Sequence, residues 1–168
     1  MCRTWCQLGY IRGIGMTARR EYYDWKDVQG MTQDLIQQTS HLKFDSVIGL
    51  TRGGLTPAVL ISHYLGIPMY PLKVGFRDHA GQEQFAANGG LLDQHSNLQA
   101  LIIDDINDSG ATINHIKQHW QLNNLTFAVL INNTSSEAEV DYSCVEINKR
   151  EDDVWIVFPW EDWWKWKK

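Results

Sequence analysis

Three acidic residues follow an apolar run near the middle of the chain, and a small hydroxyl-bearing loop comes directly after them. The run is Ala100 to Ile103, the acids are Asp104, Asp105 and Asp108, and the loop is Ser109-Gly110-Ala111-Thr112. The run predicts a buried strand, with the acids where that strand leaves its sheet. Carboxylates placed there accept hydrogen bonds from sugar hydroxyls and hold a hard divalent cation. The loop favours a phosphate, because its N–H groups, its hydroxyls and the dipole of the helix expected after it all attract an anion.

A second expected strand end carries a cation instead of acids. Val47 to Leu50 predicts a short buried strand, and Thr51-Arg52-Gly53-Gly54 predicts a turn before a helix over Thr56 to Leu65. The guanidinium of Arg52 is a permanent cation whose planar fork of donors matches phosphate oxygens. This turn predicts a second phosphate site, one strand–helix unit before the acidic segment.

An aromatic stretch near the C-terminus is the third candidate. Val154 to Phe158 predicts a strand, which Pro159, Trp160 and Glu161 follow. The indole of Trp155 can stack on a flat heterocycle, and the backbone of Ile156 beside it can read the edge of that ring. The alternative is a hydrophobic strand that binds no ligand.

Strands and helices alternate along the chain, which predicts an α/β fold. We expect a three-layer sandwich with a central, mostly parallel sheet and helices on both of its faces. Further helices are expected over Trp25 to Ile36 and Thr112 to Trp120, and further strands over Met69 to Val74 and Thr126 to Ile131. Ligands of such sheets bind beyond the carboxyl ends of the strands, where all three candidates lie.

Length and composition suit one domain. The chain has 168 residues, of which 43% are hydrophobic, enough for a sizeable core. We expect residues 1–18 to be a flexible N-terminal extension, with Met16 as an alternative start, and residues 19–168 to be the domain. Within the domain, residues 75–97 are expected to be a flexible loop, because they are long and lack a core pattern. Residues 151–168 are expected to form a small C-terminal hood with the base-binding stretch and the aromatic C-terminus.

Charge and residue usage exclude several classes of protein. A net charge of −5 and a pI of about 5.6 make nucleic acid an unlikely partner. No apolar run approaches the roughly 18 residues of a membrane span, and three cysteines do not form a disulfide framework. We therefore expect a cytoplasmic protein. Four of the eight tryptophans fall in the last nine residues, which favours a patch packed on the body or on a partner subunit over a membrane-interface belt.

The acidic segment resembles the phosphoribosyl pyrophosphate (PRPP) signature of type I phosphoribosyltransferases. That signature is a hydrophobic strand, two acids, two variable residues, then Asp, Ser or Thr, Gly, any residue and Thr. The Arg52 turn is similar to the pyrophosphate loop of the purine-type members, and the Trp155 stretch looks like the purine-binding stretch of bacterial xanthine-guanine and hypoxanthine-guanine enzymes. The resemblance implies a cis bond between Thr51 and Arg52. It also implies a homodimer or homotetramer that uses Mg²⁺.

The implied reaction is transfer of the 5-phosphoribosyl group from PRPP to a purine, with guanine, xanthine or hypoxanthine as the expected acceptors. A nucleoside monophosphate and pyrophosphate are the products, as in purine salvage. The implied catalytic residues are Arg52, which stabilises the departing pyrophosphate, and Asp108, which contacts N7 of the purine; Asp105 is the implied metal ligand. The implied PRPP-binding residues are Thr51, Arg52, Gly53, Asp104, Asp105, Asp108, Ser109, Gly110, Ala111 and Thr112, and the implied base-binding residues are Asn133, Trp155 and Ile156.

One departure concerns recognition of the base. The 6-oxopurine members place a lysine after the strand that follows the motif helix, where it reads O6. Here Asn133 lies nearest that position, and an amide both donates to an oxo group and accepts from an amino group. Adenine or a modified purine therefore stays open. Two further alternatives are a PRPP-sensing regulatory protein and a phosphoribosyltransferase for a different acceptor.

Overall fold

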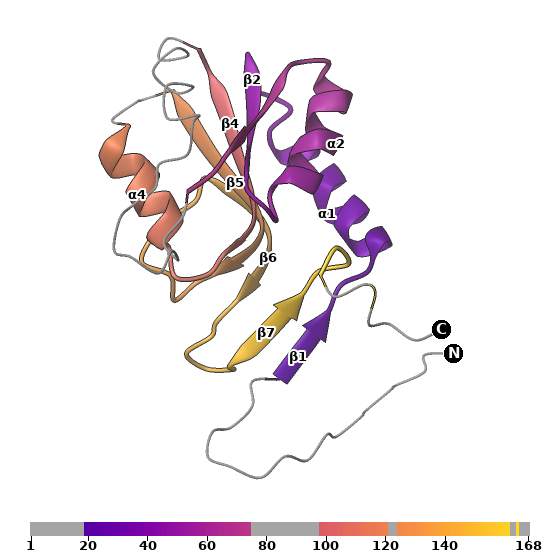
Figure 1. Cartoon of the computed structure of the whole chain (residues 1–168), viewed down its shortest axis with the longest axis vertical. Coiled ribbons are helices and arrows are strands. Elements are labelled where there is room, and N and C mark those ends of the chain that lie inside the picture. Colours follow the sequence, from indigo (N-terminus) through magenta and orange to yellow (C-terminus); the bar gives the residue numbers. More distant parts are fainter. Residues whose placement is uncertain (1–18, 75–97, 121–123, 162–163, 165–168) are drawn as a thin grey trace.

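A five-stranded parallel sheet forms the centre of the molecule (Figure 1). The computed structural model describes residues 19–74, 98–120, 124–161 and 164. The strands are β2 (Ser46–Leu50), β3 (Met69–Leu72), β4 (Ala100–Asn107), β5 (Leu125–Asn133) and β6 (Tyr142–Ile147). They lie in the order β3-β2-β4-β5-β6, and each adjacent pair is parallel. The expected parallel sheet is therefore confirmed.

Helices cover both faces of this sheet, which confirms the three-layer architecture. Helices α1 (Trp25–Gln38) and α2 (Leu55–Leu65) pack on one face, and α4 (Ala111–His119) packs on the other (Figure 1). Successive side chains of β4 pack against opposite helix layers, because side chains along a strand point alternately to the two faces of the sheet. Leu101 and Ile103 join the cluster of α1 and α2, whereas Ile102 joins that of α4.

A second, two-stranded sheet joins the two ends of the described chain. Strand β1 (Arg19–Tyr22) pairs in parallel with β7 (Val154–Val157), and Arg20 lies opposite Trp155 in the register. Figure 1 shows this small sheet beside the N-terminal start of α1, apart from the central sheet. It fixes the aromatic strand to the start of the domain.

The sequence predicted most elements to within a few residues, although β3 ends at Leu72, two residues before the predicted Val74. Strands β1 and β6 were not expected. Strand β4 continues through the acidic residues to Asn107, and Asp104 pairs with Val129 of β5. Helix α1 runs two residues beyond its expected end. The expected extension (1–18), the expected loop (75–97) and part of the C-terminal segment lie outside the described residues. Among the helices described, none is both long enough and apolar enough to cross a membrane.

Candidate active site

The turn after β2 carries Arg52 at the carboxyl edge of the sheet. The Thr51–Arg52 peptide bond is cis, as the resemblance implied. The Thr51 N–H donates to the Leu72 carbonyl at 2.9 Å, which fastens the turn to β3. A Cβ atom on Gly53 would overlap the carboxylate of Asp105. The turn and the acidic strand therefore lie in direct contact, and only glycine fits between them.

The two adjacent acids of β4 form a partly buried pair. The Asp105 N–H donates to Oδ1 of Asp104, and the Ile106 N–H donates to Oδ1 of Asp105, both at 3.0 Å. Burial raises the pKa of Asp104 well above its ordinary value, and the charge of Asp105 raises it further. Burial also raises the pKa of Asp105, with the charge of Glu161 acting in the same direction. Such a pair binds cations readily, because a cation offsets the cost of holding negative charge in this environment.

The loop between β4 and α4 has the geometry of an anion site. Gly110 has a φ of 87° and stands at the N-cap of α4, where no side chain caps the helix. Helix α1, in contrast, begins with a capping box in which Asp24 accepts from the N–H groups of Lys26 and Asp27. The Ala111 N–H in this first turn donates to the Ser109 hydroxyl, with a long donor–acceptor distance of 3.4 Å, and the N-terminus of α4 near Thr112 faces the loop as a partly open set of donors.

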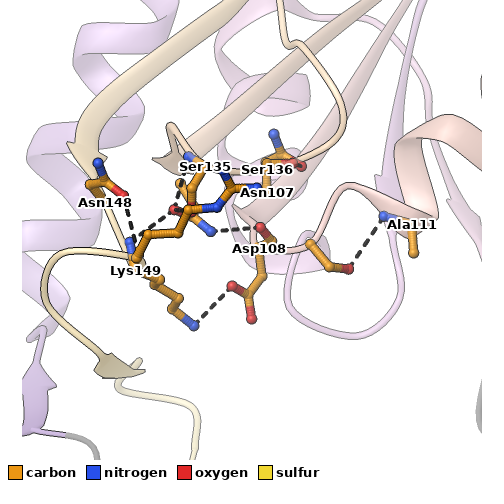
Figure 2. A network of polar contacts seen from close by, with 10 residues as sticks. Asn107, Asp108, Ala111, Ser135, Ser136, Asn148 and Lys149 are labelled. Carbon is orange, nitrogen blue, oxygen red and sulfur yellow. Dashed lines mark hydrogen bonds and ion pairs between the residues drawn. The ribbon is translucent and has the colours of Figure 1, made fainter.

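A polar segment after β5 braces this loop (Figure 2). The Glu137 N–H donates to the Ser109 carbonyl at 3.1 Å. The Asn107 amide donates to the Ala138 carbonyl at 2.8 Å and accepts from the Ser136 hydroxyl at 3.0 Å. These contacts fix the backbone on both sides of Asp108, so the loop between β4 and α4 is preorganised.

An open pocket of about 910 Å³ lies at the edge that the turn and the acids share. Its size suits a small-molecule ligand. Its lining residues are Arg20, Tyr22, Arg52, Gly53, Leu55, Thr56, Asp105, Trp155, Val157, Trp160, Glu161 and Trp164. The pocket brings together Arg52, one acid of the motif and the aromatic strand, which are distant in sequence.

The aromatic strand presents Trp155 to this pocket and keeps Val154 and Ile156, on either side of it, in the core. Trp155 is 52% exposed, whereas Val154, Ile156 and Val157 are buried. An exposed indole on a strand with a buried opposite face is positioned to stack on a planar ligand. The side chain of Ile156 lies in the core, so only its backbone is suited to the expected contact with a base.

Asn133 and Asp108 are linked through the protein itself. The Asn133 side chain is buried and donates to the Asp108 carbonyl at 2.9 Å. Its Oδ1 accepts from the Lys149 N–H at 3.1 Å and from the Ser135 hydroxyl at 2.8 Å. Oδ1 of Asp108 lies 2.9 Å from Nζ of Lys149. Direct contact between Asn133 and a base stays a prediction, and the described contacts give this amide a bracing role.

Two charged residues near the site, Arg20 and Lys149, were missed in the sequence. Arg20 enters the pocket through the β1–β7 pairing, and Glu161, which belongs to the predicted aromatic stretch, lines the same pocket. Lys149 approaches Asp108 from the connection between β6 and β7. No local pattern marks Arg20 or Lys149, because each depends on contacts between segments far apart in the chain.

Known proteins are similar to this chain in architecture and in sequence. Residues 19–162 match the phosphoribosyl transferase domain. The xanthine-guanine phosphoribosyltransferase of Idiomarina loihiensis is 25% identical over 152 residues, 88% of this chain and 91% of that protein. The same-named protein of Cereibacter sphaeroides is 30% identical over 122 residues, 69% and 68% of the two chains. The purine phosphoribosyltransferase structure from Pyrococcus horikoshii Ot3 has a TM-score of 0.71 at 28% identity, and the match covers 85% of this chain and 95% of that one. The chain belongs to the phosphoribosyl transferase domain family.

Proposed function

We propose that this protein transfers the 5-phosphoribosyl group from PRPP to a purine base, with pyrophosphate as the second product. The contact between Gly53 and the Asp105 carboxylate carries the proposal, because it joins the proposed pyrophosphate turn to the acidic end of β4 at one pocket. Trp155 lines the same pocket and is the proposed stacking surface for the acceptor base. The relatives named xanthine-guanine phosphoribosyltransferase support the choice of a purine.

The 5-phosphate of PRPP is assigned to the loop before α4. Ser109 and Thr112 supply hydroxyls, and the backbone N–H groups of the first turn supply further donors at a helix N-terminus whose N-cap residue, Gly110, has no side chain to cap it. The long contact of 3.4 Å between the Ala111 N–H and the Ser109 hydroxyl gives way to the phosphate. The glycine at a φ of 87° lets the backbone turn there. Bound in this way, the sugar lies beside the carboxylates of β4.

The ribose hydroxyls and the metal are assigned to the two adjacent acids. Asp104 and Asp105 accept hydrogen bonds from the 2- and 3-hydroxyls, and Asp105 is the proposed Mg²⁺ ligand. Among the described residues, no group of three or more His, Cys, Asp or Glu side chains is arranged to hold a metal alone. That fits Mg²⁺, which binds one or two carboxylates together with water and substrate phosphates. When bound, the metal supplies charge neutralisation on the phosphates.

The leaving group is assigned to the turn after β2. Arg52 and the backbone from Thr51 to Gly53 bind the pyrophosphate and stabilise its charge as it departs. The bond between C1 of the ribose and the pyrophosphate oxygen breaks, and its electron pair leaves with pyrophosphate. The ring that remains has oxocarbenium character, which the nearby carboxylates stabilise.

The acceptor base is assigned to Trp155 and Asp108. N9 of the stacked purine forms the new bond to C1 of the ribose, while the carboxylate of Asp108 accepts the proton from N7 and passes it to solvent. Half of the Asp108 side chain is exposed, which leaves one carboxylate oxygen for this contact. Asn133 holds the Asp108 backbone in place.

The experiment that tests the proposal is pyrophosphate release from PRPP and Mg²⁺ with six bases supplied one at a time. Guanine, xanthine, hypoxanthine, adenine, uracil and orotate form the panel. Release with one or more purines supports the proposal, and release with uracil or orotate alone overturns the choice of a purine. Tight PRPP binding without release for every base points instead to a PRPP sensor or to an acceptor outside the panel.

Two further parts of the proposal concern assembly and location. Helix α2 presents four partly exposed apolar side chains, Val59, Leu60, Tyr64 and Leu65, of which Tyr64 is 70% exposed. Such a face suits a homodimer contact, with a tetramer as the larger assembly.

We also propose that the enzyme works in the cytoplasm, which fractionation of the source cells would test.

A further inference from the structure

A lysine lies against the acid that ends the PRPP signature, although it comes from a different part of the chain. Nζ of Lys149 is 2.9 Å from Oδ1 of Asp108 (Figure 2). The Lys149 side chain is 19% exposed and the Asp108 side chain 51% exposed. The lysine is therefore the more enclosed partner, and the acid is the more open one.

The backbone of Lys149 is held by the same residue that holds Asp108. Asn133 accepts from the Lys149 N–H through Oδ1 and donates to the Asp108 carbonyl through Nδ2. The Thr134 N–H and hydroxyl both bind the Ile147 carbonyl, which anchors the start of this connection at the end of β6. The buried Asn133 amide thus fixes the acid and the lysine relative to each other.

The connection also leads directly to the aromatic strand. Lys149 lies between β6 and β7, six residues before Trp155. A base that stacks on Trp155 and reaches Asp108 lies between the two parts of the chain that flank this lysine. The position is therefore suited to a contact with the edge of the base.

The chemistry of a purine determines what such a lysine reads. N7 and the substituent on C6 lie on the same edge of the ring, so one polar pair can contact both. An ammonium group has three N–H donors, so one that pairs with a carboxylate at N7 keeps two N–H donors next to the 6-substituent. An oxo group accepts from these donors, whereas a 6-amino group offers them only further N–H groups.

We propose that Lys149 donates to the 6-oxygen of the acceptor base and so restricts the enzyme to 6-oxopurines. The inference rests on the proposed function, in particular on Asp108 facing N7. The contact with O6 then comes from Lys149 in the β6–β7 connection. Asn133, at the end of β5, holds the backbone of Lys149 in place. The absence of a lysine near Asn133 in the sequence then does not weaken the preference for guanine, xanthine or hypoxanthine.

The test compares two bases that differ in the 6-oxygen, guanine and 2-aminopurine, on wild type and Lys149→Met. Both kcat/KM and the equilibrium affinity for each base are measured, with PRPP kinetics as a second readout. A lost charge-assisted hydrogen bond lowers affinity about ten- to a hundredfold. We expect that loss for guanine, little change for 2-aminopurine, and an unchanged KM for PRPP. Lys149→Arg keeps the donors and restores part of the preference.

Arg150→Met is the matched control, because Arg150 is the adjacent cation and is exposed. It is expected to leave the ratio between the two bases unchanged. Equal losses for guanine and 2-aminopurine in Lys149→Met would mean that the lysine only steadies Asp108, and the inference would be wrong. Failure of the proposed function is recorded separately, as wild-type protein that releases no pyrophosphate with guanine.

Discussion

Gly53 lies so close to Asp105 that a methyl group on the glycine would overlap the carboxylate. One residue belongs to the turn after β2, and the other belongs to β4, more than fifty residues later in the chain. The two strands are neighbours in the parallel sheet, and their carboxyl ends meet at one edge. This contact couples the proposed pyrophosphate turn to the proposed ribose and metal site.

Gly53→Ala is expected to displace the Asp105 carboxylate and to lower kcat/KM for PRPP about a hundredfold, the loss that a misplacement of about 1 Å causes. Steady-state kinetics at saturating base measure the change. Gly30→Ala is the matched control, because a Cβ on Gly30 of α1 meets no atom within 4 Å. The control should keep full activity and gain roughly 0.5–1 kcal/mol of stability from better helix propensity. Full activity in Gly53→Ala would contradict the coupling.

Asp104→Asn is expected to stabilise the unliganded protein at neutral and alkaline pH. The folded state raises the pKa of Asp104 above its unfolded value, so protonation favours folding and this stability is lost as pH rises through the folded pKa. Asparagine is uncharged at every pH and keeps an acceptor for the Asp105 N–H. Thermal unfolding between pH 4 and pH 8 should therefore show a weaker decline with pH in the variant.

The same variant should bind PRPP about ten- to a hundredfold more weakly, because it loses charge-assisted hydrogen bonds to the ribose. Asp152→Asn is the control, since it removes only an exposed ion pair with Arg19. The control should leave the free energy of unfolding nearly unchanged, because water and salt screen an exposed pair. A pH profile of Asp104→Asn that matches the wild type would contradict the assigned cause.

Trp155→Leu is expected to raise the KM for the base roughly 5- to 150-fold, the value of one aromatic–base stacking contact. Its stability should change by no more than about 0.5 kcal/mol, because the side chain is 52% exposed. Trp160→Leu is the contrast, since the Trp160 ring stacks on the buried Phe158 at 4.8 Å. That variant should lose stability. Chemical denaturation measures the loss of stability in each variant, and steady-state kinetics measure the KM for the base. An unchanged KM in Trp155→Leu would refute the stacking role.

Gly110→Ala is expected to weaken PRPP binding and to destabilise the fold. A side chain at a φ of 87° is strained, and its Cβ would lie 2.5 Å from the Ala138 nitrogen in the bracing segment. Gly66→Ala shares the positive φ, at 67°, but its Cβ meets no atom within 4 Å. The Gly66 variant should lose about 1 kcal/mol with PRPP affinity unchanged. Equal PRPP affinities in both variants would show that the loop before α4 does not hold the 5-phosphate.

Leu60→Glu tests the proposed contact through α2. The charge on an apolar face should shift the assembly toward monomers, because a buried interfacial carboxylate is costly. Light scattering after size-exclusion chromatography measures the mass. Gln33→Glu, on the exposed side of α1, is the control and should keep the wild-type mass. A wild-type monomer, or an unchanged assembly in Leu60→Glu, would contradict this interface.

The sequence predicted the part of the site that local chemistry determines. The strand, acids and loop from Ala100 to Thr112 carry their own signals, since apolar runs, charges and glycines change there within a few residues. The cis bond at Arg52 was implied by the resemblance. Both proposed phosphate sites could therefore be predicted, because each is built from one short, continuous segment of the chain.

Contacts between distant segments could not be predicted in the same way. Strand β1 is four residues long and mostly exposed, and its partner β7 is more than 130 residues away, so no hydrophobic pattern marks the pair. Lys149 reaches Asp108 only because β6 lies at the edge of the sheet beside β5. The hydrogen bond from the Ser136 hydroxyl to the Asn107 side chain also joins segments that are far apart in the sequence.

Product analysis tests the central claim most directly. PRPP, Mg²⁺ and guanine are incubated with wild type, Gly53→Ala and Gly30→Ala, and nucleotide and pyrophosphate are quantified by chromatography and mass spectrometry. The account predicts guanosine monophosphate and pyrophosphate in equal amounts from wild type and Gly30→Ala, and about a hundredfold lower rate from Gly53→Ala. Pyrophosphate without nucleotide, or equal rates in all three proteins, would contradict it.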